Sequence, residues 1–244
     1  MTTGNYFEYV HNVSREKVVG NEGLKAYTRK VFNYMMASLG LTAVISYLIL
    51  RTGLINLFLK VDGNVVGYSG LGMLTVWSPL FIILYMSFNK NLSAKGSKIG
   101  LFTVAGLEGA SLSLLLLYAG VHNAFQAFLI TGVLFGSMSL YGYITKKDLL
   151  QMGSFLIMGV WGLVLVSIIG MFTGGVGIWA SYLTVILFTG LVAYETQQIK
   201  YIYSNLGGYG ETSDKLAVFC ALNLYLSFLN IFTAILNILG SSRD

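Results

Sequence analysis

The stretch that decides the fold is residues 216–239, LAVFCALNLYLSFLNIFTAILNIL, which contains no charged side chain. As a helix it would be about 36 Å long, at about 1.5 Å per residue. The hydrocarbon core of a bilayer is about 30 Å thick. A run of this length and composition is typical of a helix that crosses a membrane.

Six more apolar windows of similar length precede this run, each bounded by charged residues or by clusters of Gly, Asn and Ser. They are residues 31–50, 71–88, 99–119, 124–144, 153–172 and 179–202. A membrane β-barrel would instead show short segments that alternate apolar and polar residues. The sequence therefore predicts an all-α membrane protein, a seven-transmembrane helical bundle.

The composition supports a membrane protein over a water-soluble one. Of the 244 residues, 55% are hydrophobic and 10% are charged, against roughly 25% charged in an average soluble domain. The net charge of +5 is expected in loops that flank the membrane rather than on a face that binds nucleic acid. The single cysteine, Cys220, permits no internal disulfide.

The basic residues assign a direction to the seven spans. With seven spans, 12 of the 15 Lys and Arg residues fall on the side of the amino terminus, and Arg51, Lys60 and Arg243 fall on the other. Because cytoplasmic loops carry an excess of Lys and Arg, we predict a cytoplasmic amino terminus and an external carboxyl terminus in the inner (plasma) membrane. The predicted organisation is a cytoplasmic segment at 1–30, a single transmembrane domain at 31–240 and a short tail at 241–244.

Two acidic residues fall inside the predicted spans, where a charge is expensive. Glu108 lies in the middle of the window 99–119, and Glu195 lies near the cytoplasmic end of 179–202. Glu195 has an alternative interpretation as an interfacial residue paired with Lys200. For Glu108 the alternative interpretation is a protonated acid that donates a hydrogen bond to a backbone carbonyl.

The last span carries a polar stripe at spacings of three and four residues, which places its members on one helical face. The stripe consists of Asn223, Ser227, Asn230, Ala234 and Asn237. Amides in hydrocarbon are stabilised by partners on other helices, so we expect the last helix to be enclosed by the first six. The asparagines have an alternative role, which is only to hold helices together.

The depths of the polar groups indicate that some of them share a layer. Measured from the cytoplasmic ends of their spans, Glu108, Glu195 and Ser227 lie roughly 14, 11 and 17 Å deep. This agreement predicts a polar chamber near the cytoplasmic side, although depth does not determine which way a side chain faces.

Small residues are expected to bring some helices close together. Gly132 and Gly136 in the fourth window, and Gly159 and Gly162 in the fifth, have the spacing of close helix contacts. The sequence contains no cluster with metal-site spacing, no phosphate-binding loop and no nucleophile elbow. We therefore expect neither an enzyme nor a bound cofactor.

Five motifs, in order along the chain, resemble the Bax inhibitor-1 family in its bacterial branch. They are GLKAY leading to VFNYM (23–35), SLYGYITKKDL (139–149), GSFLIMG (153–159), GLVAYETQQIK (190–200) and LYLSFLNIF (224–232). The resemblance extends from about Gly23 to Gly240. It implies a seven-helix bundle in which the last helix is surrounded by the other six.

The resemblance also implies a function, because members of that family are described as pH-sensitive calcium leak channels and as regulators of cell death or membrane proteolysis. Their pH sensor is a pair of aspartates, and the matching positions here are Glu195 and Ser227. Ser227 cannot ionise, so two carboxylates cannot share a proton at this pair. We therefore expect altered or weakened pH sensing, with Glu108 as a hypothetical second carboxylate.

These observations leave two hypotheses of different kinds. The first is a calcium leak in which Glu195, and in one version Glu108, lines or gates the ion pathway. The second is a regulator that transports nothing and acts by contact with a membrane protease or another membrane protein. A solute transporter is a third reading, but it would gain from an inverted repeat, which we do not detect.

Overall fold

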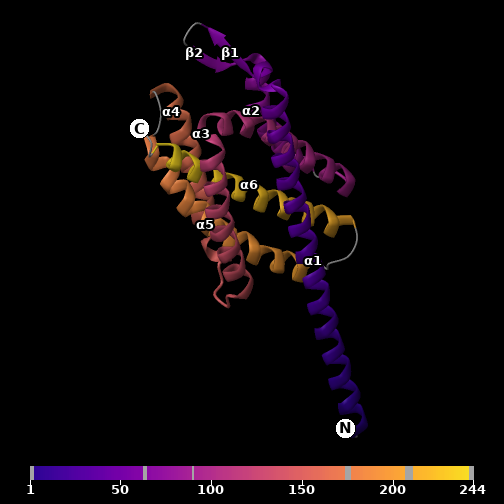
Figure 1. The fold of residues 1–244 in the computed structure, drawn as a ribbon. Coiled ribbons are helices and arrows are strands. Elements are labelled where there is room, and N and C mark those ends of the chain that lie inside the picture. The colour runs from indigo at the N-terminus through magenta and orange to yellow at the C-terminus, as the bar shows by residue number, and fades with distance from the viewer. Residues whose placement is uncertain (1–2, 63–64, 90, 174–176, 207–210, 242–244) are drawn as a thin grey trace.

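The computed structural model describes residues 3–62, 65–89, 91–173, 177–206 and 211–241. Within them, six helices are long and apolar enough to cross a membrane, so the chain is an all-α membrane protein (Figure 1). Arg243 and the predicted tail beyond Ser241 lie outside the described residues. In chain order the elements are α1 (Thr3–Thr52), η1 (Leu54–Leu57), β1 (Leu59–Asp62), β2 (Val65–Tyr68), α2 (Gly70–Phe88), α3 (Ala94–Ile144), η2 (Leu150–Met152), α4 (Gly153–Thr173), α5 (Gly177–Leu206) and α6 (Glu211–Ser241).

Helix α3 covers two of the predicted windows and is interrupted at Gly120, whose backbone (φ 79°, ψ 156°) is not helical. We call residues 94–119 its first arm and residues 121–144 its second arm. A positive φ is accessible to glycine without the steric penalty that a side chain brings. The predicted outer loop at 120–123 is therefore reduced to one non-helical residue.

The two arms of α3 lie against the same turn of α6, which means that the chain reverses at Gly120. The Ala105 carbonyl accepts a hydrogen bond from Thr42, whose Oγ1 lies 2.8 Å from the Tyr225 hydroxyl. The Phe135 ring packs against Phe228, with ring centroids 5.6 Å apart. In a continuous helix, positions 105 and 135 would be about 45 Å apart, yet they meet residues only three positions apart on α6.

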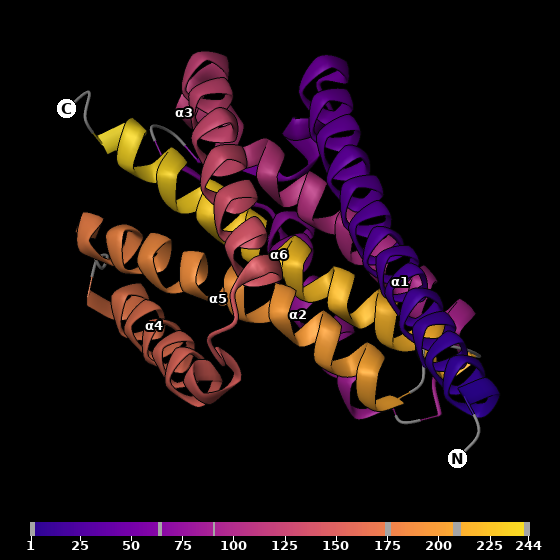
Figure 2. The ribbon, with the colours of Figure 1, turned by 90° about the horizontal axis from the view of Figure 1, so that it is seen from below.

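Helix α6 is the most buried of the six apolar helices. In its most apolar stretch 72% of the residues are buried, against 17 to 39% in the other five helices. It packs against α5, both arms of α3 and α1, and Figure 2 shows it running between α1 and α5. Its fully buried side chains include Leu224, Tyr225, Ile231 and Leu236. The core of the bundle is therefore built around α6.

Hydroxyl groups and a glycine hold α1 against the first arm of α3. Thr42 and Ser46 donate hydrogen bonds to the carbonyls of Ala105 and Gly109 at 2.9 and 2.6 Å. A Cβ on Gly109 would lie 2.8 Å from the Thr42 carbonyl oxygen, so the close approach requires glycine at this position.

The prediction of close helix contacts at Gly132, Gly136 and Gly162 is wrong, because a Cβ at any of these positions would meet nothing within 4 Å. Gly159 does pack closely, against the Leu187 side chain. A pair of small residues promotes helix contact only when it faces a neighbouring helix. Gly132 and Gly136 are instead on the exposed side of the second arm.

The sequence analysis did not predict the short helices η1 and η2 or the hairpin of strands β1 and β2, which pair antiparallel between α1 and α2. The sequence signal for the hairpin was available, since Gly63-Asn64, the two residues between the paired Asp62 and Val65, is a dipeptide typical of two-residue hairpin loops.

Candidate functional site

The centre of the candidate site is a contact between Glu195 on α5 and Ser227 on α6. The Ser227 Oγ lies 3.0 and 2.9 Å from the two carboxylate oxygens of Glu195 and donates its proton to them. Ser227 is buried, whereas Glu195 keeps part of its surface exposed. The structure therefore brings together two of the three predicted site residues.

Close packing of the second arm of α3 fixes this part of α5. Thr196 donates to the Val192 carbonyl at 2.8 Å and lies 3.2 Å from the Ser139 hydroxyl. Next to this contact, a Cβ on Gly142 would overlap the backbone of Ala193. Residues on both sides of Glu195 are thus held by contacts that leave no room for another side chain.

Lys200 does not pair with Glu195, contrary to the interfacial alternative. Its Nζ donates to the Tyr143 carbonyl at 2.6 Å and lies 5.5 Å from the centre of the Tyr143 ring. An ion pair joins Lys30 on α1 to Asp214 on α6. The Glu195 carboxylate therefore has a hydroxyl, and no cation, as its hydrogen-bond partner in this part of the chain.

Glu108 lies on a different side of α6. It follows Ala105 by one turn on the first arm of α3, and Ala105 is linked through Thr42 to Tyr225. Tyr225 and Ser227 are two positions apart and so point about 200° apart around α6. Glu108 is partly buried and makes no hydrogen bond or ion pair among the described residues, so the structure does not join it to Glu195.

Tyr225 and Thr42 form a buried polar link that the sequence analysis did not single out. Thr42 donates to backbone carbonyls, so the Tyr225 hydroxyl is the donor in their 2.8 Å contact. The signal for it was a tyrosine in the middle of an apolar span, because a buried hydroxyl needs a partner.

The asparagine stripe of α6 does not form the expected bonds between helices. Asn230 donates to the Leu226 carbonyl of its own helix at 2.8 Å. Asn223 and Asn237 are exposed, and the described residues include no hydrogen-bond partner for either side chain. The three asparagines therefore do not tie α6 to its neighbours within the described residues, whereas Ser227 of the same stripe bonds to Glu195 on α5.

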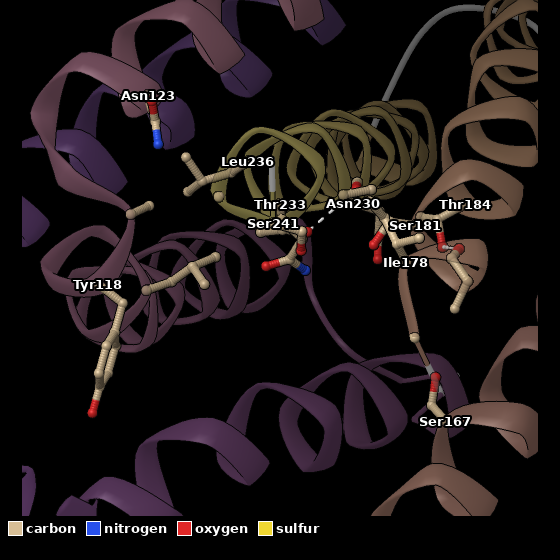
Figure 3. Close-up of a pocket in the computed structure, with 17 residues that line it drawn as sticks. Tyr118, Asn123, Ser167, Ile178, Ser181, Thr184, Asn230, Thr233, Leu236 and Ser241 are labelled. Atoms are coloured by element: carbon tan, nitrogen blue, oxygen red, sulfur yellow. Dashed lines mark hydrogen bonds between the residues drawn. The ribbon is translucent and has the colours of Figure 1, made fainter. Parts of the chain in front are cut away.

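A polar cavity of about 760 Å³ opens where α6 ends, between α6, α5, α4 and the Gly120 end of α3. Figure 3 shows Asn230, Ser181 and Thr184 grouped on one side of it, and Asn123 on the other side beyond Leu236. We call this cavity the outer vestibule, because the distribution of basic residues predicts that it opens away from the cytoplasm. Its lining combines amide and hydroxyl side chains with apolar ones and contains no charged group.

The outer vestibule approaches the Glu195–Ser227 contact along α6. Its deepest lining residue on α6 is Asn230, which is three positions, or about 4.5 Å, from Ser227. Along α6 the vestibule therefore ends about one helical turn from Ser227, whereas its deepest lining residue on α5 is Thr184, eleven positions from Glu195.

On the opposite side of Glu195, the connection between α3 and α4 is fastened to α5. The side-chain amide of Gln197 accepts from the Leu149 N–H at 2.7 Å and donates to the Lys147 carbonyl at 2.7 Å. Gln197 was quoted only as part of a motif, and sequence alone gave no reason to expect this bridge. Among the described residues, no group of three His, Cys, Asp or Glu side chains is arranged to hold a metal ion.

Comparison with known proteins gives a consistent result. A family model described as inhibitor of apoptosis-promoting Bax1 matches residues 24–244. The uncharacterized protein RP147 of Rickettsia prowazekii is 36% identical over 98% of this chain and 99% of its own length. The inner membrane protein YbhL of Escherichia coli is 32% identical over 91% of this chain and 94% of its own.

Proposed function

The chain belongs to the Bax inhibitor-1 family, and from that premise we propose that it is a calcium leak channel of the bacterial inner membrane. The proposed path for calcium enters the outer vestibule, passes Asn230 and is closed at the Glu195–Ser227 contact. The inner membrane is the location that the name of the Escherichia coli relative gives for that protein.

We also propose seven spans, with each arm of α3 crossing the membrane once and α6 enclosed by the others. The arms would be about 39 and 36 Å long, and each exceeds the hydrocarbon thickness of about 30 Å. An odd number of spans agrees with Figure 2, where the start of α1 and the end of α6 lie at opposite ends of the bundle. The distribution of basic residues then supports a cytoplasmic amino terminus.

The observation that carries the proposal is the position of Glu195. It is a carboxylate inside the membrane, bonded to the hydroxyl of Ser227, and Ser227 is about one turn of α6 from a cavity that opens to one side. An acidic residue within a span is expensive and typically marks an ion or proton pathway. The uncharged amides and hydroxyls of the outer vestibule offer oxygen atoms, which are the ligands that calcium prefers.

The proposal predicts a shallow pH response. A single carboxylate changes its charge by one proton, so the flux it controls changes at most about tenfold per pH unit. Two coupled carboxylates titrate in two steps, and Ser227 provides no second carboxylate. We expect Ser227→Asp to steepen the response and Glu195→Gln to flatten it.

The test is calcium flux into proteoliposomes loaded with a calcium-sensitive dye, measured over a pH series. Glu108→Gln is the matched control, because it removes the other intramembrane acid, which has no contact with Ser227. A steep response that survives Glu195→Gln but not Glu108→Gln would move the sensor to Glu108. Flux no greater than in protein-free liposomes at every pH would overturn the channel proposal and favour the contact regulator.

A further inference from the structure

A second cavity opens on the side of the bundle, between α1 and the two arms of α3. Its volume is about 290 Å³, and it is lined almost entirely by apolar side chains. We call it the α1–α3 groove. Leu39, Tyr47 and Leu50 of α1 form one wall, and Val121 and Phe128 of the second arm form the other; Leu116 and Phe232 lie on the floor, among others.

The groove has the length of one leaflet of a bilayer. Along α1 it extends from Leu39 to Leu50, which is about 16 Å of helix. Half of the hydrocarbon core is about 15 Å. Leu50 is also the last residue of the apolar window 31–50, so the groove begins at the membrane boundary where α1 ends and reaches the middle of the bilayer.

The groove is too narrow for a helix. A volume of about 290 Å³ spread over that length, widened by the radius of a water molecule on each side, corresponds to a slot roughly 7 Å across. A helix with its side chains is about 10 Å wide. The slot therefore fits one hydrocarbon chain.

The floor of the groove requires no polar ligand. Thr42 and Ser46, which are its buried hydroxyl residues, already donate to carbonyls of the first arm. A saturated chain could therefore lie over them without leaving a buried donor unpaired.

A positive charge stands at the mouth of the groove. Arg51 follows the groove residue Tyr47 by four positions, so the two side chains are neighbours on the surface of α1. Arg51 is exposed, and no described carboxylate pairs with it. Arginine binds phosphate through two parallel hydrogen bonds, and tyrosine is enriched at the level of lipid headgroups.

We propose that the α1–α3 groove binds one acyl chain of a phospholipid from the leaflet at the end of α1, and that Arg51 binds the phosphate of the same lipid. The site is separate from the outer vestibule, from which the side chains of α6 divide it. It does not depend on which side of the membrane is cytoplasmic.

The test uses the purified full chain and phosphatidylglycerol. Lipid that stays bound is counted by native mass spectrometry, and a spin-labelled phosphatidylglycerol in liposomes reports chains with restricted motion. Ala43→Trp fills the groove, and Val44→Trp is its control, because Val44 is the next residue and does not line the groove. Arg51→Gln removes the charge at the mouth, and Arg29→Gln removes an exposed arginine near the other end of the span.

We expect Ala43→Trp to abolish one tightly bound lipid per chain, and Arg51→Gln to weaken its binding about fivefold to tenfold. The two controls should retain it. Equal retention in Arg51→Gln and Arg29→Gln would overturn the proposal even if Ala43→Trp failed to fold. A change of oligomeric mass in Ala43→Trp with lipid retention unchanged would also overturn it and would assign the groove to a second copy of the chain.

Discussion

Replacing Gly142 by alanine should separate the second arm of α3 from α5. The added Cβ would overlap the Ala193 carbonyl oxygen and lie 2.9 Å from the Ala193 carbon and Cα. Ordinary contacts of this kind begin near 3.4 Å, so the backbones must move apart by more than about 0.5 Å, because the overlap with the carbonyl oxygen is larger than the overlap with the two carbon atoms. The atoms in conflict belong to the backbone of a packed helix and cannot rotate away.

This separation removes two kinds of stabilisation. Overpacking of a filled interior costs about 1 to 3 kcal/mol. The 3.2 Å contact between Thr196 and Ser139 would stretch beyond hydrogen-bonding distance, at a cost of about 1 kcal/mol. The alanine also gains about 1 kcal/mol of helix propensity, so we expect Gly142→Ala to lower the free energy of unfolding by about 2 kcal/mol and the midpoint of thermal unfolding by about 4 °C or more.

The assay is thermal unfolding in mild detergent, followed by circular dichroism and by the loss of monodisperse protein. Gly136→Ala is the matched control, because it lies on the same arm with nothing within 4 Å of its Cβ. It should be neutral or slightly stabilising, since alanine favours helix over glycine by about 1 kcal/mol. If the two variants unfold at the same temperature, the close contact between α3 and α5 does not exist as described.

Two further predictions concern the buried hydroxyl link and the topology. Tyr225→Phe should lower the free energy of unfolding by about 1 kcal/mol, because Thr42 keeps its own carbonyl partners. Thr42→Val should lower it by about 2 kcal/mol or more, because it leaves the Tyr225 donor buried and unpaired. Equal effects of the two variants in chemical unfolding would refute the assignment of Tyr225 as the donor. A periplasmic reporter fused after Asp244 should be active, and one placed between Lys146 and Lys147 should be inactive; a cytoplasmic signal after Asp244 would mean an even number of spans.

The helices could be predicted from sequence because a bilayer imposes a length. Each apolar window of about 20 residues lies within a helix or one arm of α3, although α1 already begins at Thr3, well before its window at 31–50. The break between the arms was predicted within three residues, since the windows end at 119 and resume at 124. The β1–β2 hairpin was missed because only runs long enough to cross a membrane were sought.

The site could be predicted only in part. The depth of a residue in the membrane follows from its position along the span, but the direction in which its side chain points does not. Glu195 and Ser227 were placed in one layer and do meet. Glu108 was placed in the same layer, yet it is on the side of Tyr225, since the rotation of each helix depends on which neighbours it packs against. The same reason explains why Gly142 is tightly packed while Gly132, with the clearer motif, is not.

The turn at Gly120 also constrains how the bundle can move. With a single non-helical residue between them, the arms of α3 have no slack with which to slide past one another. The first arm is hydrogen-bonded to α1 through Thr42 and Ser46, and the second arm is hydrogen-bonded to α5 through Thr196. We therefore expect a displacement of α1 to shift α3 as a unit and, through α3, to shift α5, which carries Glu195.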